Sequence, residues 1–256
     1  MSKPRVFIST PCYDAMMTMQ YTISLLKLVT TLSKNNIEYM IDFIGNESLI
    51  PRARNKSLYN FYKSNFTHLL FIDSDIEFNP DAVHDLLLFE KDVVCCAYPR
   101  KDFNWKRFAY SMKVESDSKE SFDSRGLDFT YNAMTKEGKV IQDGNFIQVR
   151  HASTGFMMIR REIIEKLYSK HDELMIKSDD MSSKDNMYCG LFCCMIKNQQ
   201  YLSEDYSFCE RVIDLGGSVW INVKHNLNHV GKYVFKSDLA NRKTYNRTES
   251  ERTFYT

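Results

Sequence analysis

The sequence has no long hydrophobic run: none of its apolar stretches approaches the 18 residues at which a membrane-spanning helix is expected. It also leaves no room for a signal peptide, because the opening residues MSKP lead almost directly into a strand-like segment. These two absences predict a cytoplasmic, soluble protein without a transmembrane segment.

An excess of charge of either sign is absent as well. The 34 Lys and Arg residues against 33 Asp and Glu give a formal net charge of +1. Strong non-specific binding to phosphate backbones needs a basic surface, so we expect no nucleic-acid partner. A composition that is 43% hydrophobic and 26% charged is that of a globular protein with a sizeable core.

Cysteine pairs with the spacing of a zinc module are also missing. Cys189, Cys193 and Cys194 follow a C-x3-C-C pattern, which lacks the C-x2-C pairs typical of structural zinc sites. Cys95 and Cys96 lie in an apolar segment, where a thiol behaves as a small hydrophobic group. This odd total of 7 cysteines fits an intracellular protein without a zinc module.

Glycine-rich phosphate loops are absent too. The sequence contains neither a G-x-G-x-x-G fingerprint nor a Walker A lysine loop. A dinucleotide site of the Rossmann type and a P-loop are therefore not indicated.

The most informative stretch that is present is FTHLLFIDSDIEFNP, residues 66–80. Its apolar run, residues 68–72, predicts a strand buried on both faces of a parallel sheet. Asp73 and Asp75 follow two residues apart, so both side chains lean to the same side in an extended segment. Asn79 and Pro80 then predict a helix start. The two carboxylates either cap and solvate the strand end or, as we favour, hold a divalent cation against a phosphorylated substrate.

The elements around this stretch alternate between strand and helix. We expect strands at residues 5–9, 39–44, 68–72 and 92–97, with helices at residues 21–34, 51–63 and 80–90 between them. This order predicts an α/β fold with a mostly parallel, doubly wound, Rossmann-like central sheet flanked by helices. Ligands of such sheets bind at the carboxyl ends of the strands, where the aspartates lie.

Two arginines, Arg52 and Arg54, stand at the start of the second helix. Because a helix start favours anions, a pair of guanidinium groups there is unusual. They either face the crevice and hold a diphosphate or form a solvated surface pair.

The rest of the chain is expected to be less regular. The aromatic-rich residues 98–150 are either a lid or acceptor surface or, as we favour, an antiparallel edge packed on its own aromatics. Residues 152–159 predict one strand with Gly155 near its start, where a backbone or ligand approaches closely. Residues 169–187 predict a mobile loop, and the residues after Lys236 predict a charged surface helix or arm.

An acidic pair and a histidine are further candidates. Ser203 predicts a helix cap directly before Glu204 and Asp205, so the acids either complement the helix dipole or supply a general base. Adjacent residues at a helix start point in different directions, so we expect only one acid to face a substrate. His229 is either a structural histidine or a third ligand of the cation.

Taken together, the motifs TPCYD, PRARN, LLFIDSDIEFNP, STGFMMIRRE, SEDYSFCERVIDLGGSVW and NHVG occur in the order seen in nucleotide-sugar glycosyltransferases of the GT-A fold. The chain resembles family-2-like enzymes of bacteria and large DNA viruses over residues 4–233. The resemblance implies one GT-A domain, residues 1–236, with a nucleotide-sugar-binding half (1–100), a smaller acceptor and catalytic half (101–236) and a C-terminal tail (237–256). If the chain is viral, its compartment would be the host cytoplasm.

The resemblance also implies roles for single residues. Asp73 and Asp75 would form the D-x-D site, with Asp75 as the direct Mn²⁺ or Mg²⁺ ligand and His229 completing the metal site. Asp205 or Glu204 would be the catalytic base. The contacts to the nucleotide sugar would come from Thr10, Pro11, Tyr13, Asp42, Arg54, Asp73 and Ser74.

The implied function is transfer of a sugar from a UDP- or GDP-linked donor, UDP favoured, to an acceptor hydroxyl on a glycan or glycoprotein, with inversion. There is no Q-x-x-R-W after the E-D segment, so a processive synthase is not expected, and the second strand lacks the Asp-Gly-Ser ending common in the family. Two alternatives stay open: a sugar-nucleotide pyrophosphorylase, which would want a Gly-rich basic loop after the first strand, and a non-catalytic nucleotide-binding domain.

Overall fold

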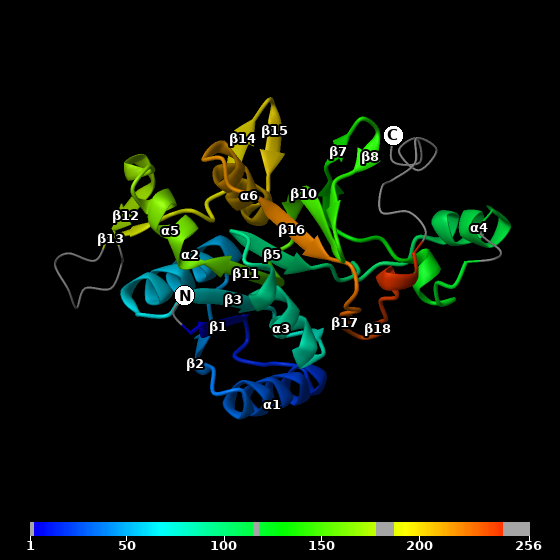
Figure 1. Ribbon diagram of the computed structural model, residues 1–256, viewed down its shortest axis with the longest axis horizontal. Helices are drawn as coiled ribbons and strands as arrows, with labels where there is room; N and C mark the ends of the chain where they lie inside the picture. The colour runs from blue at the N-terminus through cyan, green and yellow to red at the C-terminus, as the bar shows by residue number, and fades with distance from the viewer. Residues whose placement is uncertain (1–2, 115–117, 178–186, 243–256) are drawn as a thin grey trace.

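A nine-stranded sheet forms the centre of the molecule, with helices on both faces (Figure 1). The computed structural model describes residues 3–114, 118–177 and 187–242. Along the sheet the strands are β2 (Glu38–Gly45), β1 (Arg5–Cys12), β3 (His68–Ile72), β11 (Phe156–Arg160), β5 (Val93–Cys96), β16 (Val219–Asn222), β10 (Phe146–Ala152) and β6 (Tyr131–Ala133), and β9 (Gln142–Asp143) also pairs with β10.

Most strands of this sheet run in one direction. Only β11 and β10 run opposite to the others, because β11 pairs antiparallel with both β3 and β5, and β10 pairs antiparallel with β16, β6 and β9. The expected α/β class, with a mostly parallel, Rossmann-like sheet flanked by helices, is confirmed. The position of β11 between β3 and β5 was not expected from the strand order along the chain.

The helices form one layer on each side of the sheet. Alternate residues of β3 face opposite sides: Leu70 and Ile72 pack in the core with α1 and α3, whereas Leu69 and Phe71 pack in the core with α2, α5 and α6. This burial on both faces is what the unbroken apolar run predicted. The helices are α1 (Met19–Lys34), α2 (Ile50–Lys63), α3 (Pro80–Phe89), α4 (Trp105–Val114), α5 (Arg161–Tyr168) and α6 (Glu204–Asp214).

Residues 152–159 form two strands and a turn, so the prediction of one strand is wrong. β10 ends at Ala152, β11 begins at Phe156, and the turn between them carries Gly155. β10 and β11 both run opposite to the other strands, so the chain does not reverse direction here but crosses the sheet. This crossing places β11 between β3 and β5, in the centre of the sheet.

The region after β5 contains the expected antiparallel edge, formed by β6, β9 and β10. Its aromatics pack on one another, with the ring centroid of Phe108 5.5 Å from that of Phe103 and 4.7 Å from that of Phe122. Helix α4 was not expected. Its sequence does carry apolar residues at helical spacing, Trp105, Phe108, Ala109 and Met112, but Ser111 is its only buried residue.

Short elements complete the described chain. Small antiparallel sheets are formed by β4 (Ile76–Glu77), β17 (Asn228–Val230) and β18 (Val234–Phe235), by β7 (Thr135–Lys136) and β8 (Lys139–Val140), by β12 (Met175–Lys177) and β13 (Met187–Cys189), and by β14 (Met195–Lys197) and β15 (Gln200–Leu202). The 3₁₀ turns are η1 (Ser124–Gly126), η2 (Asp172–Leu174) and η3 (Leu239–Asn241).

Two expectations about irregular segments need correction. Within residues 169–187, η2 and the β12–β13 pair are ordered elements, while the rest of the predicted mobile loop, residues 178–186, lies outside the described residues. The start of the predicted surface arm is not on the surface, because Leu239 and Arg242 are buried against residues 120–129. Residues 243–256 lie outside the described part. No helix in the described ranges is long and apolar enough to cross a membrane.

Candidate active site

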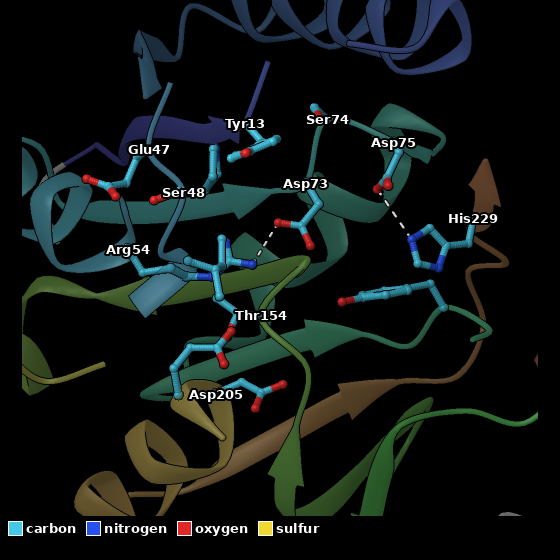
Figure 2. Close-up of a pocket in the computed structure, with 14 residues that line it drawn as sticks. Tyr13, Glu47, Ser48, Arg54, Asp73, Ser74, Asp75, Thr154, Asp205 and His229 are labelled. Carbon is cyan, nitrogen blue, oxygen red and sulfur yellow. Dashed lines mark hydrogen bonds and ion pairs between the residues drawn. The ribbon is translucent and has the colours of Figure 1, made fainter. Parts of the chain in front are cut away.

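A cleft of about 380 Å³ opens where β1 and β3 end (Figure 2). Its walls come from segments far apart in the sequence: the loops after β1, β2 and β3, the turn before β11, the start of α6 and strand β17. The lining residues are Pro11, Tyr13, Glu47, Ser48, Ile50, Arg54, Asp73, Ser74, Asp75, Tyr98, Thr154, Glu204, Asp205 and His229. The carboxyl edge of the sheet is the place that the sequence predicts for a ligand.

The D-S-D turn is held by backbone hydrogen bonds on both sides. The Asp73 amide donates to the Gly155 carbonyl at 2.9 Å, and the Thr18 amide at the start of α1 donates to the Ser74 carbonyl, also at 2.9 Å. The amide of Ile76 donates back to the Asp73 carbonyl at 3.2 Å. Both aspartates therefore project into the cleft, as the spacing of two residues predicts.

Asp73 is paired with a buried arginine. Arg54 Nη2 lies 2.7 Å from Asp73 Oδ1, and the Arg54 side chain is only 3% exposed. Burial lowers the pKa of Arg54, but the Asp73 carboxylate outweighs it, so the net shift is upward. Within the described chain Arg54 Nε and Nη1 have no hydrogen-bond partner. Arg54 is thus a fixed positive charge, and its Nε and Nη1 groups are hydrogen-bond donors that have no acceptor in the described residues.

The second arginine at the start of α2, Arg52, lies on the surface and not in the cleft. Arg52 is 49% exposed and pairs with Glu47 at 2.6 Å. Of the two interpretations of the arginine pair, the crevice-facing one fits Arg54 and the surface one fits Arg52.

Asp75 lies between a histidine and a lysine. The β4–β17 pairing, together with a bond of 2.8 Å from the Val230 amide to the Asp75 carbonyl, brings His229 beside Asp75. His229 Nε2 is 3.3 Å from Asp75 Oδ1, and the Lys101 ammonium contacts Asp75 Oδ2. Burial raises the pKa of the Asp75 carboxyl, but hydrogen bonds from His229 and Lys101 outweigh burial and lower it overall.

The tautomer of His229 follows from its other neighbour. His229 Nδ1 lies 2.9 Å from the Pro99 carbonyl, which can only accept a hydrogen bond, so Nδ1 carries the proton. Nε2 is therefore the nitrogen that faces Asp75, and a ring held through Nδ1–H by a carbonyl is the arrangement common for a metal-binding histidine. Asp75 and His229 therefore fit a divalent cation.

The predicted three-ligand set is not assembled. In the described residues no group of three or more His, Cys, Asp or Glu side chains lies close enough to hold a metal, and Asp73 is occupied by Arg54. A cation at this place would draw its remaining ligands from a bound diphosphate and water.

Two acids from the start of α6 form the opposite wall. Both Glu204 and Asp205 line the cleft, and which of the two would face a substrate stays a prediction. Burial, followed by the neighbouring Asp205, raises the pKa of Glu204. Asp205 Oδ1 accepts a bond of 2.8 Å from the Tyr206 amide and another from the Ser203 hydroxyl. Ser203 stands at the cap position, but its side chain orients Asp205 and does not cap a backbone amide.

Helix α6 is anchored to β10 by a buried glutamate. Glu210, 2% exposed, accepts hydrogen bonds from Arg150 at 2.6 and 2.8 Å, from His151 at 2.7 Å and from Lys197 at 2.8 Å. Burial raises the pKa of Glu210, but these donors dominate and lower it to about 2. The charged network anchors the C-terminal half of α6, the helix whose first turn carries Glu204 and Asp205.

Not every predicted contact residue reaches the cleft. Pro11, Tyr13 and Ser74 line it, with Tyr13 64% exposed. Thr10 is fully buried and bonds the Tyr21 hydroxyl at 2.6 Å, and Asp42 bonds Ser9 and Asn60, both at 3.3 Å. Thr10 and Asp42 are therefore not among the residues that line the cleft.

The sequence interpretation missed several residues that line the cleft, namely Glu47, Ser48, Ile50, Tyr98 and Thr154, and it also missed Lys101, which contacts Asp75. Thr154 and Gly155 lie within the quoted STGF segment, and the Thr154 hydroxyl is buried with no partner in the described part of the chain. A Cβ on Gly155 would lie 2.3 Å from the Tyr98 hydroxyl and 2.6 Å from Asp73 Oδ2. A close approach at Gly155 is present, but the groups that approach are the side chains of Tyr98 and Asp73, not a backbone or a ligand.

Comparisons with known proteins supply no assignment. No protein-family model and no curated protein matches the sequence. Among solved structures, the chain is similar to A197 from STIV, with 16% identity, a TM-score of 0.47 and coverage of 96% of this chain and 99% of that chain. It is also similar to S. aureus TarS 1-349 (11% identity, TM-score 0.39, 85% of this chain and 57% of that chain) and to the inositol-1-phosphate CTP transferase from T. maritima (10%, 0.38, 87% and 90%). These similarities assign neither a family nor an activity, so the function rests on the residues of the cleft.

Proposed function

We propose that the protein is a metal-dependent, GT-A-like glycosyltransferase that moves a sugar from a nucleoside diphosphate sugar to an acceptor hydroxyl. The observation that carries this proposal is the meeting of three features in one cleft: the Asp75–His229 pair, the buried Arg54 guanidinium and the acids Glu204 and Asp205 on the facing wall. A diphosphate needs positive charge, and an acceptor hydroxyl needs a base.

The donor would bind along the Asp73–Asp75 side. Asp75 and His229 would hold Mn²⁺ or Mg²⁺, and the imidazole ligand favours Mn²⁺ because Mg²⁺ prefers oxygen ligands alone. When bound, the cation neutralises the diphosphate leaving group. Arg54 would donate hydrogen bonds to the donor, and the exposed Tyr13 ring would stack on its base, with UDP favoured.

The acceptor would approach from the α6 side. Asp205 would take the proton of the acceptor hydroxyl as its oxygen bonds to the anomeric carbon and the bond from that carbon to the diphosphate breaks. Attack from the wall facing the diphosphate side predicts inversion of the anomeric centre. In Figure 2, Asp205 and Asp75 lie on opposite sides of the drawn cleft. The acceptor would be a sugar hydroxyl on a glycan or glycoprotein, and transfer would be non-processive.

The pyrophosphorylase alternative lacks support in the same cleft. Such an enzyme would want a basic glycine-rich loop after the first strand, and residues 10–14 contain neither glycine nor lysine nor arginine. Loss of Asp75 or of the acidic pair would suggest a non-catalytic domain. The chain has Asp75, Glu204 and Asp205.

Calorimetry tests the proposal. UDP and GDP are titrated into the protein with Mn²⁺ and with EDTA, and into Asp75→Ala and His229→Ala. We expect nucleotide binding that depends on Mn²⁺ in the wild type, loses that dependence in Asp75→Ala and weakens in His229→Ala without a fall in melting temperature. Asp85→Ala is the matched control, because Asp85 also pairs with a lysine and a histidine but is not a cleft residue. Equal affinity of the wild type in EDTA and Mn²⁺ would refute the metal assignment.

A further inference from the structure

The two aspartates of the D-S-D turn are each neutralised by a basic residue of the chain, but in different ways. Arg54, paired with Asp73, is 3% exposed and stacks over Phe71, with its Cζ 5.2 Å from the ring centroid. Lys101, paired with Asp75, is 38% exposed. A buried planar guanidinium is held in one position, whereas an ammonium on a flexible four-carbon stem can exchange partners.

The backbone around Lys101 is held by neighbouring segments, while its side chain is 38% exposed. Pro99 bridges to Phe129 and its carbonyl accepts from His229, and the Arg100 amide donates to the Asp128 carbonyl at 2.8 Å. A Cβ on Gly231 would lie 3.3 Å from Lys101 Cδ, so the glycine of the NHVG motif leaves room for the lysine stem. The Lys101 ammonium is therefore kept at the edge of the cleft whichever partner it contacts.

The present partner of Lys101 conflicts with the proposed metal site. A divalent cation on Asp75 would stand within a few ångströms of the Lys101 ammonium, and like charges at that separation disfavour each other strongly. The conflict is removed if the ammonium has another anion within reach. A diphosphate bound beside Asp75 is such an anion, and lysine is a common phosphate ligand.

We propose that Lys101 is a diphosphate-binding residue that is held by Asp75 while the cleft is empty and transfers to the diphosphate when a metal-bound donor enters. This inference rests on the proposed function, because it takes Asp75 as the metal ligand. Lys101 would then compete with the cation when no nucleotide is present and assist it when a nucleotide is bound. Cation and nucleotide would bind synergistically, each strengthening the binding of the other.

Lys101→Gln separates these two effects because they have opposite signs. Its affinity for Mn²⁺ alone, measured by calorimetry, is expected to rise about tenfold, the size expected when a like charge at contact distance is removed. Its affinity for UDP in saturating Mn²⁺ is expected to fall about tenfold, because one charged hydrogen bond to the phosphates is lost. Lys101→Arg keeps the charge and should resemble the wild type in Mn²⁺ affinity.

Lys224→Gln is the matched control. Lys224 is 53% exposed and also pairs with an aspartate, at 2.9 Å, but that aspartate, Asp85, does not line the cleft, so neither affinity should change. Unchanged or weaker Mn²⁺ binding by Lys101→Gln would overturn the inference, and so would unchanged UDP binding, provided that the wild type binds both.

Failure of the proposed metal site gives a different result. In that case the wild type binds no Mn²⁺ and binds UDP equally well in EDTA. The EDTA titration then decides the role of Lys101: weaker UDP binding by Lys101→Gln would keep it as a diphosphate ligand, and equal binding would remove it from the site.

Discussion

At the scale of single residues, the partners of each carboxylate distinguish four acids that share one cleft. Asp73 faces a buried arginine, Asp75 faces His229 and Lys101, and Asp205 is held by Ser203 and Tyr206. Burial, followed by the charge of Asp205, dominates the environment of Glu204 and raises its pKa. The acid whose position is fixed by hydrogen bonds, Asp205, is the better candidate for a base that must meet a substrate hydroxyl in one geometry.

The catalytic assignment predicts how two variants differ. Asp205→Asn is expected to lower turnover by roughly 10²–10⁴, the usual contribution of a positioned base, while UDP–Mn²⁺ affinity stays nearly unchanged. Glu204→Gln is the control, with a smaller loss. The measurements are transfer or donor-hydrolysis rate and, separately, calorimetric affinity. Near-normal turnover of Asp205→Asn with an inactive Glu204→Gln would move the base to Glu204.

At the scale of elements, the turn before β11 sets the floor of the cleft. The amide of Gly155 donates to the Tyr98 hydroxyl at 3.0 Å, and its carbonyl accepts from the Asp73 amide at 2.9 Å. One glycine thus connects β11, the end of β3 and the segment after β5. Any side chain at this position must displace Tyr98 or Asp73.

We therefore expect Gly155→Ala to damage both stability and binding. Overpacking of this kind costs about 1–3 kcal/mol of the free energy of unfolding, measured by urea denaturation, and displacement of Asp73 should weaken UDP–Mn²⁺ binding. Gly45→Ala is the control, because its Cβ would meet only Ala15 Cβ at an ordinary 3.7 Å. Equal stability of the two variants would show that the turn adapts without strain.

The β3–β11 pairing also predicts a pH dependence of stability. It places Arg160 opposite His68, and burial, followed by the charge of Arg160, lowers the pKa of His68 from 6.5 to about 4. Between these values the unfolded chain binds a proton that the folded chain does not. Stability is therefore greatest above pH 6.5 and falls as the pH drops towards 4, by about 3 kcal/mol from this group.

The test is urea denaturation across that pH range. His68→Gln should show a flatter profile between pH 6.5 and 4, and His84→Gln, at an exposed position, should keep the wild-type profile. A His68→Gln profile as steep as that of the wild type would assign the acid sensitivity to other groups.

At the scale of the whole molecule, the last described residues connect to the region after β5. Arg242 Nη2 bonds Glu120 Oε1 at 2.8 Å and the carbonyls of Ser124 and Leu127, and its guanidinium stacks over Phe129. The Glu120 side chain is completely buried. The segment after β18 thus packs against residues 120–129. These residues pair in turn with Pro99, close to Lys101, through Phe129.

Removing this contact is expected to be costly. Arg242→Ala leaves a buried carboxylate without its cation and should lower the free energy of unfolding by about 3–5 kcal/mol in urea denaturation. Arg52→Ala breaks an exposed pair and should cost less than about 1 kcal/mol. Losses of similar size in both variants would mean that the Arg242 contact contributes no more than a surface pair.

The sequence by itself determined the features that depend on neighbouring residues. The apolar run of β3, the two acids after it and the start of α3 at Asn79 and Pro80 are local patterns, and the structure contains each of them. The alternation of strands and helices likewise determined the α/β class, because the hydrophobic periodicity of each element and the turn residues between elements are local features of the sequence. The acids at the start of α6 were found for the same reason.

Only the tertiary structure decided which of these features meet. His229 reaches Asp75 through the pairing of β17 with β4, and β11 enters between β3 and β5, because strand partners are chosen by packing between distant segments and not by local pattern. The same packing turned Thr10 towards Tyr21 and brought Lys101 to Asp75, although neither direction is marked in the sequence. Loops lack the regular periodicity from which the direction of a side chain can be predicted in a helix or strand. The position of a loop side chain in the cleft therefore depends on the fold around it.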